Sequence, residues 1–123
     1  IQVVTDMILN VGTIAQAKFD FEVSTYGLAK TALAHGSKLN PLDKPLTIGN
    51  LVDKLIKDEV KRDKCLSILV RTTDSGYGPD IYSLNLKAYW EVTTPGQVAT
   101  HRRYPEFGTG IFITQEVIGD PKW

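Results

Sequence analysis

Two stretches of the chain alternate apolar and polar residues, and this pattern predicts β-strands. In "AQAKFDFEVS", residues 15–24, alanine, phenylalanine and valine occupy every second position and polar residues occupy the others. A period of two is typical of a half-buried strand. Residues 1–9 are rich in β-branched side chains, so we expect the two stretches to pair as a hairpin with a turn between Asn10 and Gly12.

The longest alternating stretch is "IYSLNLKAYWEVT", residues 81–93. It predicts one long strand whose residues from Tyr82 to Val92 at even positions face the core, while those from Ser83 to Glu91 at odd positions face solvent. Three further strands are predicted at residues 65–73, 98–104 and 110–118, on the basis of their β-branched and aromatic content. Loops are expected at residues 74–80 and 93–97.

Helical spacing replaces the period of two between the predicted hairpin and the later strands. Residues 47–64 form the clearest helix, with Thr47 as its N-cap. Its apolar stripe consists of Ile48, Leu51, Val52, Leu55, Ile56 and Val60. A shorter helix is expected over residues 24–36, where Gly36 can close the last turn in a left-handed conformation.

These elements predict a single α+β domain over residues 1–123, in the order β-β-α-α-β-β-β-β. The expected architecture is an antiparallel sheet of five to six strands with two helices packed on one face. The other face would stay open, because the outward positions of the strands are mostly polar. Open faces and edges of sheets are places where partners dock.

Composition narrows the expected partners and location. Lys plus Arg and Asp plus Glu both total 14, so the net charge is zero and general steering toward nucleic acid is absent. Zero net charge also removes a repulsion that opposes self-association. One cysteine allows no internal disulfide. With no apolar run of about 18 residues and no signal peptide visible, we expect a cytoplasmic or virion protein without a membrane span.

The segment "THRRYPEF", residues 100–107, gathers positive charge between aromatic residues. If a longer loop joins it to the preceding strand, Tyr89 lies opposite Arg102 and Lys87 lies opposite Tyr104 on the open face. A shift of one residue would replace Arg102 with Arg103. These five residues are candidates for binding phosphate or a stacked base. The alternative is that they only stabilise a solvated sheet through cross-strand pairs.

"RRYPEF" resembles the Arg-Arg-Tyr-x-acidic-Phe segment of phox-homology domains, which bind phosphoinositides. The resemblance implies that Arg103 would hold a phosphate and that Tyr104 would lie against the inositol ring. It covers about eight residues, and the predicted helices precede the small meander instead of following it. We therefore do not assign the chain to that family.

No catalytic or metal-binding constellation is evident in the sequence. With two histidines and one cysteine, a structural zinc site is not expected. Asp58 and Glu59 diverge on a charged helix, and Ser75 and His101 lack an orienting acid. We therefore expect no cofactor, no metal and no enzymatic activity.

The first functional hypothesis is a structural or assembly subunit that forms a homo-oligomer or part of a virus particle. It would use the open sheet face and edge strands, with Trp123 as a docking anchor. The alternative is a module that binds RNA, DNA or a phosphorylated ligand, and the two roles can coexist. A third hypothesis is a small enzyme with its site in the loop from Asp74 to Asp80.

Overall fold

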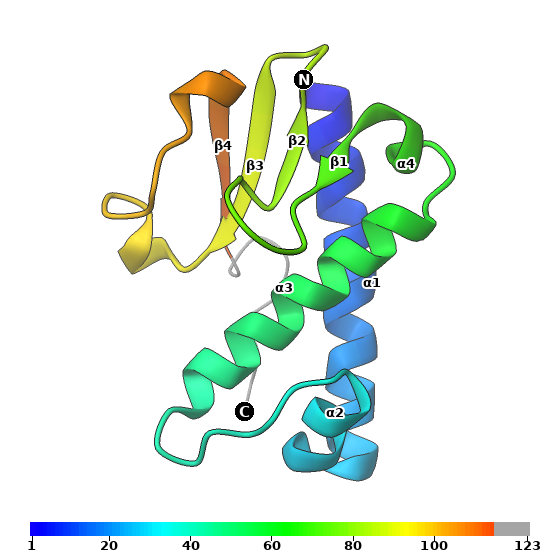
Figure 1. The fold of residues 1–123 in the computed structure, drawn as a ribbon. Helices are drawn as coiled ribbons and strands as arrows, with labels where there is room; N and C mark the ends of the chain where they lie inside the picture. Colours follow the sequence, from blue (N-terminus) through cyan, green and yellow to red (C-terminus); the bar gives the residue numbers. More distant parts are fainter. Residues whose placement is uncertain (115–123) are drawn as a thin grey trace.

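The chain forms a helical N-terminal half and a sheet-containing C-terminal half (Figure 1). The computed structural model describes residues 1–114, apart from the side chains of residues 45, 46 and 95. The helices are α1 Gln2–Tyr26, α2 Leu28–Ala34, α3 Lys44–Arg62 and α4 Leu66–Leu69. The strands are β1 Arg71–Thr72, β2 Ile81–Ser83, β3 Ala88–Thr93 and β4 Thr109–Thr114, and 3-10 turns at Pro95–Gln97 and Pro105–Phe107 lie between the last two.

The sheet is four-stranded and mixed, with the strand order β1-β2-β3-β4. β1, β2 and β3 pair antiparallel, whereas β4 lies parallel to β3. All helices of the described residues precede the strands. The α+β class is therefore correct, but the predicted antiparallel sheet of five to six strands and the order β-β-α-α-β-β-β-β are wrong.

The predicted N-terminal hairpin is a single long helix, α1. Its buried apolar residues are three or four positions apart, and they are Val4, Ile8, Val11, Ala15, Phe19 and Val23. Of the five alternating apolar residues between positions 15 and 23, the stripe includes only Ala15, Phe19 and Val23. Phe21, by contrast, is 67% exposed. Packing of the stripe against α3 outweighs the weak helix propensity of the β-branched residues.

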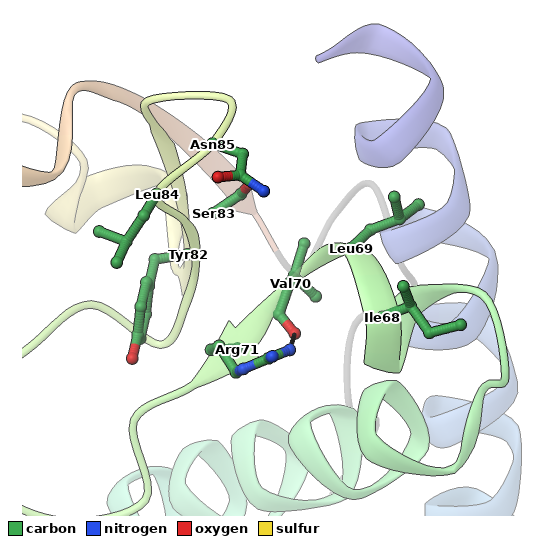
Figure 2. A pocket seen from close by; sticks show the side chains of 8 residues that line it. All are labelled: Ile68, Leu69, Val70, Arg71, Tyr82, Ser83, Leu84 and Asn85. Atoms are coloured by element: carbon green, nitrogen blue, oxygen red, sulfur yellow. Dashed lines mark hydrogen bonds between the residues drawn. The ribbon is translucent and has the colours of Figure 1, made fainter.

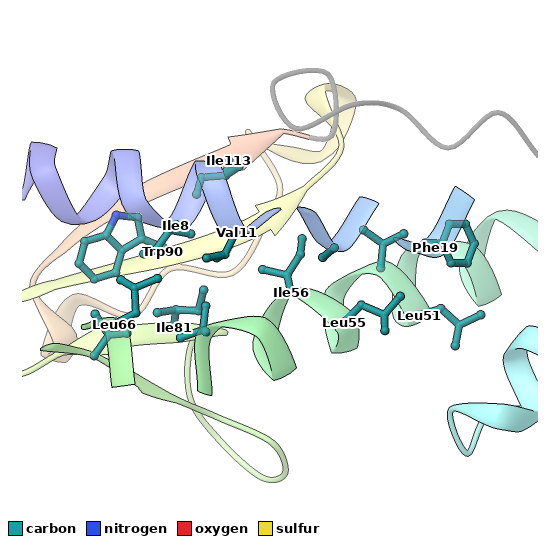
Figure 3. Packing of buried hydrophobic residues seen from close by; sticks show 14 of the residues in the cluster. Ile8, Val11, Phe19, Leu51, Leu55, Ile56, Leu66, Ile81, Trp90 and Ile113 are labelled. Atoms are coloured by element: carbon teal, nitrogen blue, oxygen red, sulfur yellow. The ribbon is translucent and has the colours of Figure 1, made fainter. Parts of the chain in front are cut away.

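The core lies where α1, α3 and the sheet meet (Figure 3). The predicted stripe of α3 is confirmed, because all six of its apolar residues are buried. From the sheet, Trp90, Ile81 and Ile113 point toward α1 and α4. The indole Nε1 of Trp90 donates a hydrogen bond of 2.8 Å to Thr5 Oγ1, which ties β3 to the first turns of α1.

Two other predicted strands are shorter than expected. Residues 65–73 begin with the helical turn α4, because the Asp63 carboxylate accepts the backbone N–H groups of Cys65 and Leu66, both at 2.9 Å. Residues 81–93 are a hairpin instead of one strand. Its turn contains the exposed Leu84 and Leu86 and ends at Lys87, whose φ is 53°.

The chain does not return beside β3 at residues 98–104. Instead it crosses back before β4 begins, as parallel pairing requires. Tyr89 therefore pairs with Tyr82 and Gly110, and the predicted pairing with Arg102 is wrong. Gly108, with φ 98°, lets the chain pass close to the Lys87 carbonyl, which accepts the Thr109 N–H at 2.9 Å.

The sheet face opposite the helices is covered, which corrects the prediction of an open face. The Tyr104 ring meets the Tyr89 ring at 5.6 Å between centroids, and the Phe107 ring meets the Tyr82 ring at 5.1 Å. Tyr89 is consequently only 2% exposed. Trp123 and the end of the last predicted strand lie outside the described residues.

No helix within residues 1–114 combines the length and apolar character that a bilayer crossing needs.

Replacing Gly108 with alanine should strongly destabilise the fold. A Cβ there would lie 2.0 Å from the Lys87 carbonyl oxygen, and the left-handed backbone adds strain. Gly27→Ala is the matched control, because Gly27 also has a positive φ but nothing within 4 Å of an added Cβ. Urea unfolding should show a loss of about 1–2 kcal/mol for the control and more than about 3 kcal/mol for Gly108→Ala. Equal losses would contradict this account of the crossover.

Candidate functional site

Three carboxylates and one lysine meet where α3 passes the ends of β2 and β3, and we call Asp53, Asp80 and Glu91 with Lys57 the carboxylate cluster. α3 contributes Asp53 and Lys57, which are one turn apart. The Lys57 Nζ lies 3.3 Å from Asp53 Oδ2 and 3.4 Å from Asp80 Oδ1. The ion pair of Asp53 with Lys57 within α3 thus extends to Asp80 in the loop before β2.

Backbone hydrogen bonds hold Asp80 and Glu91 against each other. The Asp80 N–H donates to Glu91 Oε1 at 3.3 Å, and the Val92 N–H donates to Asp80 Oδ2 at 3.0 Å. Glu91 is only 3% exposed, although the sequence pattern placed it in solvent. The His101 Nε2 lies 3.9 Å from Glu91 Oε2 and closes the cluster from the crossover.

The cluster holds more negative than positive charge. Burial raises the pKa of Glu91 to about 9, and the hydrogen bond and charge of Asp80 act in the same direction. Burial, followed by the charge of Asp80, raises the pKa of Asp53 to about 7. Although burial acts to lower the pKa of Lys57, its two carboxylate partners outweigh burial and raise it. Protons therefore balance part of the excess charge at neutral pH.

Among residues 1–114, Asp53 Oδ1 in the cluster and Thr93 Oγ1 on the same strand as Glu91 are buried and find no hydrogen-bond partner. Thr93 is 6% exposed and follows Glu91 by two positions in β3, so its side chain projects from the same face of the sheet. A buried hydroxyl without a partner costs about 1–3 kcal/mol. An unsatisfied buried oxygen on the sheet face that carries Glu91 is a group that a bound ligand could contact.

The donors suit a hard divalent cation. Mg²⁺ binds oxygen ligands, and it often takes one or two carboxylates together with water and a substrate phosphate. In the described part of the chain, no three His, Cys, Asp or Glu side chains are arranged to hold a metal ion. Asp80 and Glu91 would supply two carboxylates to such an ion, and water would have to supply its remaining ligands.

The exposed Arg102 lies on two tyrosines, and we call Arg102, Tyr77 and Tyr104 the arginine–tyrosine platform. The guanidinium carbon of Arg102 is 4.6 Å from the Tyr77 ring centroid and 5.6 Å from that of Tyr104. The two rings meet edge to face at 5.2 Å. The Tyr77 hydroxyl donates a hydrogen bond to the Glu106 carboxylate, which places one negative charge at the platform's rim.

Arg103 has a different environment from Arg102. Its guanidinium donates to the carbonyl oxygens of His101 at 2.8 Å and Val98 at 2.9 Å, and it lies 4.1 Å from the Phe112 ring centroid. These contacts fix the shape of the crossover. The Arg102 guanidinium instead lies on the two tyrosine rings, with the Glu106 carboxylate close enough for the two charges to interact.

Tyr104 joins the platform to the carboxylate cluster. Its ring lies beneath Arg102, and its N–H donates to the Tyr89 hydroxyl at 3.1 Å. Burial and then the charge of Glu91 raise the pKa of the Tyr104 hydroxyl, and Asp80 contributes in the same direction. The Tyr104 hydroxyl is therefore within electrostatic reach of Glu91 and Asp80.

The structure brings together four of the residues that the sequence singled out. Tyr89, Arg102, Arg103 and Tyr104 all meet at the crossover, with Tyr89 buried beneath the others. Lys87 ends the β2–β3 turn and supports β4 through its carbonyl.

Sequence reasoning missed the carboxylate cluster as a unit. Its members are scattered from position 53 to position 91, and Glu91 follows a pattern that indicates solvent exposure. One signal did exist, because the loop from Asp74 to Asp80 was considered as an enzyme site and ends at a cluster residue. A buried Glu91 could not be anticipated without knowing what covers its face.

A separate pocket of about 190 Å³ lies at the β1 edge of the sheet (Figure 2). It is lined by Ile68, Leu69, Val70, Arg71, Tyr82, Ser83, Leu84 and Asn85. Its one charged side chain, Arg71, donates to the carbonyls of Ser67 and Val70. The pocket therefore presents no chemistry comparable to the carboxylate cluster.

Replacing Glu91 with glutamine should stabilise the fold at alkaline pH. Because the pKa of Glu91 is raised in the folded state, that state binds more protons than the unfolded chain between pH of roughly 4 and 9. The free energy of unfolding should therefore fall as pH rises through this window in the wild type. Glu91→Gln removes that loss, and urea unfolding in EDTA should show a gain on the order of 2 kcal/mol at pH 9.

The control is Glu106→Gln, which removes an exposed carboxylate whose pKa is lowered by the Tyr77 hydroxyl. This variant should not become more stable at pH 9. If Glu91→Gln proves less stable than the wild type at pH 9, the carboxylate is a net stabilising group and our description of the cluster fails.

Comparison of the chain with protein-family models, curated proteins and solved structures found no match.

Proposed function

We propose that the chain is a hydrolase that cleaves a phosphodiester with the help of a divalent cation at Asp80 and Glu91. The observation that carries this proposal is the packing of these two carboxylates beside Asp53, on the sheet face where the buried Thr93 hydroxyl finds no hydrogen-bond partner within residues 1–114. With all three carboxylates deprotonated, the cluster would hold two negative charges in excess of Lys57, so a bound divalent cation would take the place of the protons that Glu91 and Asp53 otherwise carry. This departs from the expectation of a non-enzymatic protein, and it develops the third hypothesis.

In the proposed reaction, the oxygen of a water molecule bonds to phosphorus and the ester P–O bond breaks. One proton of the water passes to solvent, and the leaving alkoxide takes up a proton to become an alcohol. A bound cation would polarise the phosphoryl oxygen and the water. Asp80 and Glu91 would hold it, and the Lys57 ammonium, 3.4 Å from Asp80, would stabilise the charge that develops on the phosphate.

The proposal predicts one cation-binding site that depends on Glu91. Titration with Mn²⁺, followed by electron paramagnetic resonance, should show about one bound ion per chain. Hydrolysis of bis(p-nitrophenyl) phosphate in Mg²⁺ or Mn²⁺ should fall at least about 100-fold in Glu91→Gln. The same variant should lose the tight Mn²⁺ site, while remaining folded.

Glu59→Gln is the matched control, because Glu59 is a carboxylate of α3 and the substitution removes its ion pairs with Lys18 and Arg62. It should keep Mn²⁺ binding and hydrolysis. A wild-type protein that binds no Mn²⁺ and hydrolyses no diester would contradict the proposed function.

A role as an assembly subunit remains a second proposal, and a stripe on α1 favours it. Val3, Ile14 and Phe21 are exposed and share one side of the helix, since they are separated by 11 and seven residues. With zero net charge, two copies of the chain do not repel each other strongly. Two stripes packed antiparallel would form a self-complementary dimer contact. This surface replaces the covered sheet face as the candidate interface.

Light scattering after size exclusion should detect the dimer at tens of micromolar. Phe21→Glu should weaken its association at least about tenfold, because the charge would be buried in the contact. Leu42→Glu is the control, since Leu42 is 95% exposed in the loop after α2 and lies outside the stripe. A strictly monomeric wild type would contradict the assembly proposal.

A further inference from the structure

We infer that the substrate of the proposed site is single-stranded nucleic acid, gripped by the arginine–tyrosine platform. This inference rests on the proposed function, since it names the substrate class of the same site. The platform lies next to the carboxylate cluster along the crossover, because His101, which precedes Arg102, places its Nε2 3.9 Å from Glu91 Oε2. A strand whose backbone phosphate meets Arg102 would thus run over the crossover toward Asp80, whose side chain is 18% exposed, while Glu91 lies buried behind the crossover.

The composition of the platform favours an unpaired strand over a free phosphate. Arg102 presents a guanidinium that can meet a phosphate with two parallel hydrogen bonds. Tyr77 is 56% exposed, and its ring offers a flat apolar surface for a base. Cation contacts with aromatic rings and stacking of bases on tyrosine are how proteins hold single strands without reading their sequence. In a duplex the bases are stacked on each other and cannot reach Tyr77.

The crossover holds the platform in place before any strand arrives. The Tyr104 ring is packed edge to face against the Tyr77, Tyr89 and Phe107 rings. Arg103 fixes the preceding turn through its hydrogen bonds to His101 and Val98. A rigid aromatic surface loses little conformational freedom on binding, so more of the contact energy is available for affinity.

Glu106 limits the affinity of the platform for anions. Its carboxylate accepts the Tyr77 hydroxyl and lies close enough to Arg102 for that charge to help lower the pKa of Glu106. The carboxylate repels a phosphate and partly neutralises the arginine. A strand is therefore held moderately, which suits an enzyme that must also release its products.

Binding can be tested without hydrolysis by working in EDTA. Fluorescence anisotropy of a labelled DNA strand of about 12 nucleotides should report binding by the wild type at low salt. Arg102→Ala should raise the dissociation constant about tenfold and reduce the slope of log K against log salt by about 0.7. Tyr77→Ala should weaken binding by at least about fivefold with little change in the slope, because it removes stacking and not charge.

Two controls sharpen the result. Arg62→Ala removes an exposed arginine at the end of α3 that pairs with Glu59, and it should bind the strand as the wild type does. Glu106→Gln should bind it more tightly, because the opposing charge is lost. If the wild type does not bind in EDTA, prefers a duplex of the same length, or loses no more in Arg102→Ala than in Arg62→Ala, the inference is overturned.

The outcome separates the inference from the proposed function. Arg102-dependent strand binding by a protein that neither binds Mn²⁺ nor hydrolyses a diester would uphold the platform and reject the hydrolase. Mn²⁺ binding and hydrolysis of the small diester without strand binding would uphold the hydrolase and reject the platform.

Discussion

The burial of both faces of β3 is the constraint on which the rest of this structure depends. On one face Trp90 packs into the helical core and donates its indole hydrogen bond to Thr5. On the other face the crossover between β3 and β4 lays Tyr104 over Tyr89. A strand covered on both sides has no solvent-facing positions, so every polar residue in it must find a partner inside the protein.

Glu91 and Thr93 are the polar residues of β3 that this burial leaves with few partners. Glu91 finds the Asp80 backbone N–H but no close lysine of its own, while Thr93 finds no hydrogen-bond partner among the described residues. Proteins commonly keep such unfavourable groups at sites where a ligand later satisfies them. The physical strain of the cluster and its proposed chemistry are therefore two aspects of the same arrangement, since the missing partner is what a cation would provide.

The sequence predicted the parts of the fold that local spacing determines, and it did not predict the parts that depend on packing between distant segments. The stripe of α3 was predictable, because a residue's position on a helix face follows from spacing alone. α1 was mistaken for a hairpin because Ala15, Phe19 and Val23 fit both a period of two and a helical stripe, and β-branched residues tilted the choice toward strands. The decisive fact was that Ala17 and Phe21 are exposed, and only the packing on α3 determines this.

The site was less predictable than the fold, because it is assembled by the crossover. Arg102, Arg103 and Tyr104 could be singled out by their charge and aromatic character, but parallel pairing of β4 requires a connection whose path local sequence does not specify. That path gives the two adjacent arginines different tasks. The Arg103 guanidinium donates hydrogen bonds to carbonyl oxygens of the loop. The Arg102 guanidinium instead lies on the tyrosine rings at the surface. The loop therefore does two things at once: it covers the face of β3 that carries Glu91, and it holds the arginine–tyrosine platform over that face.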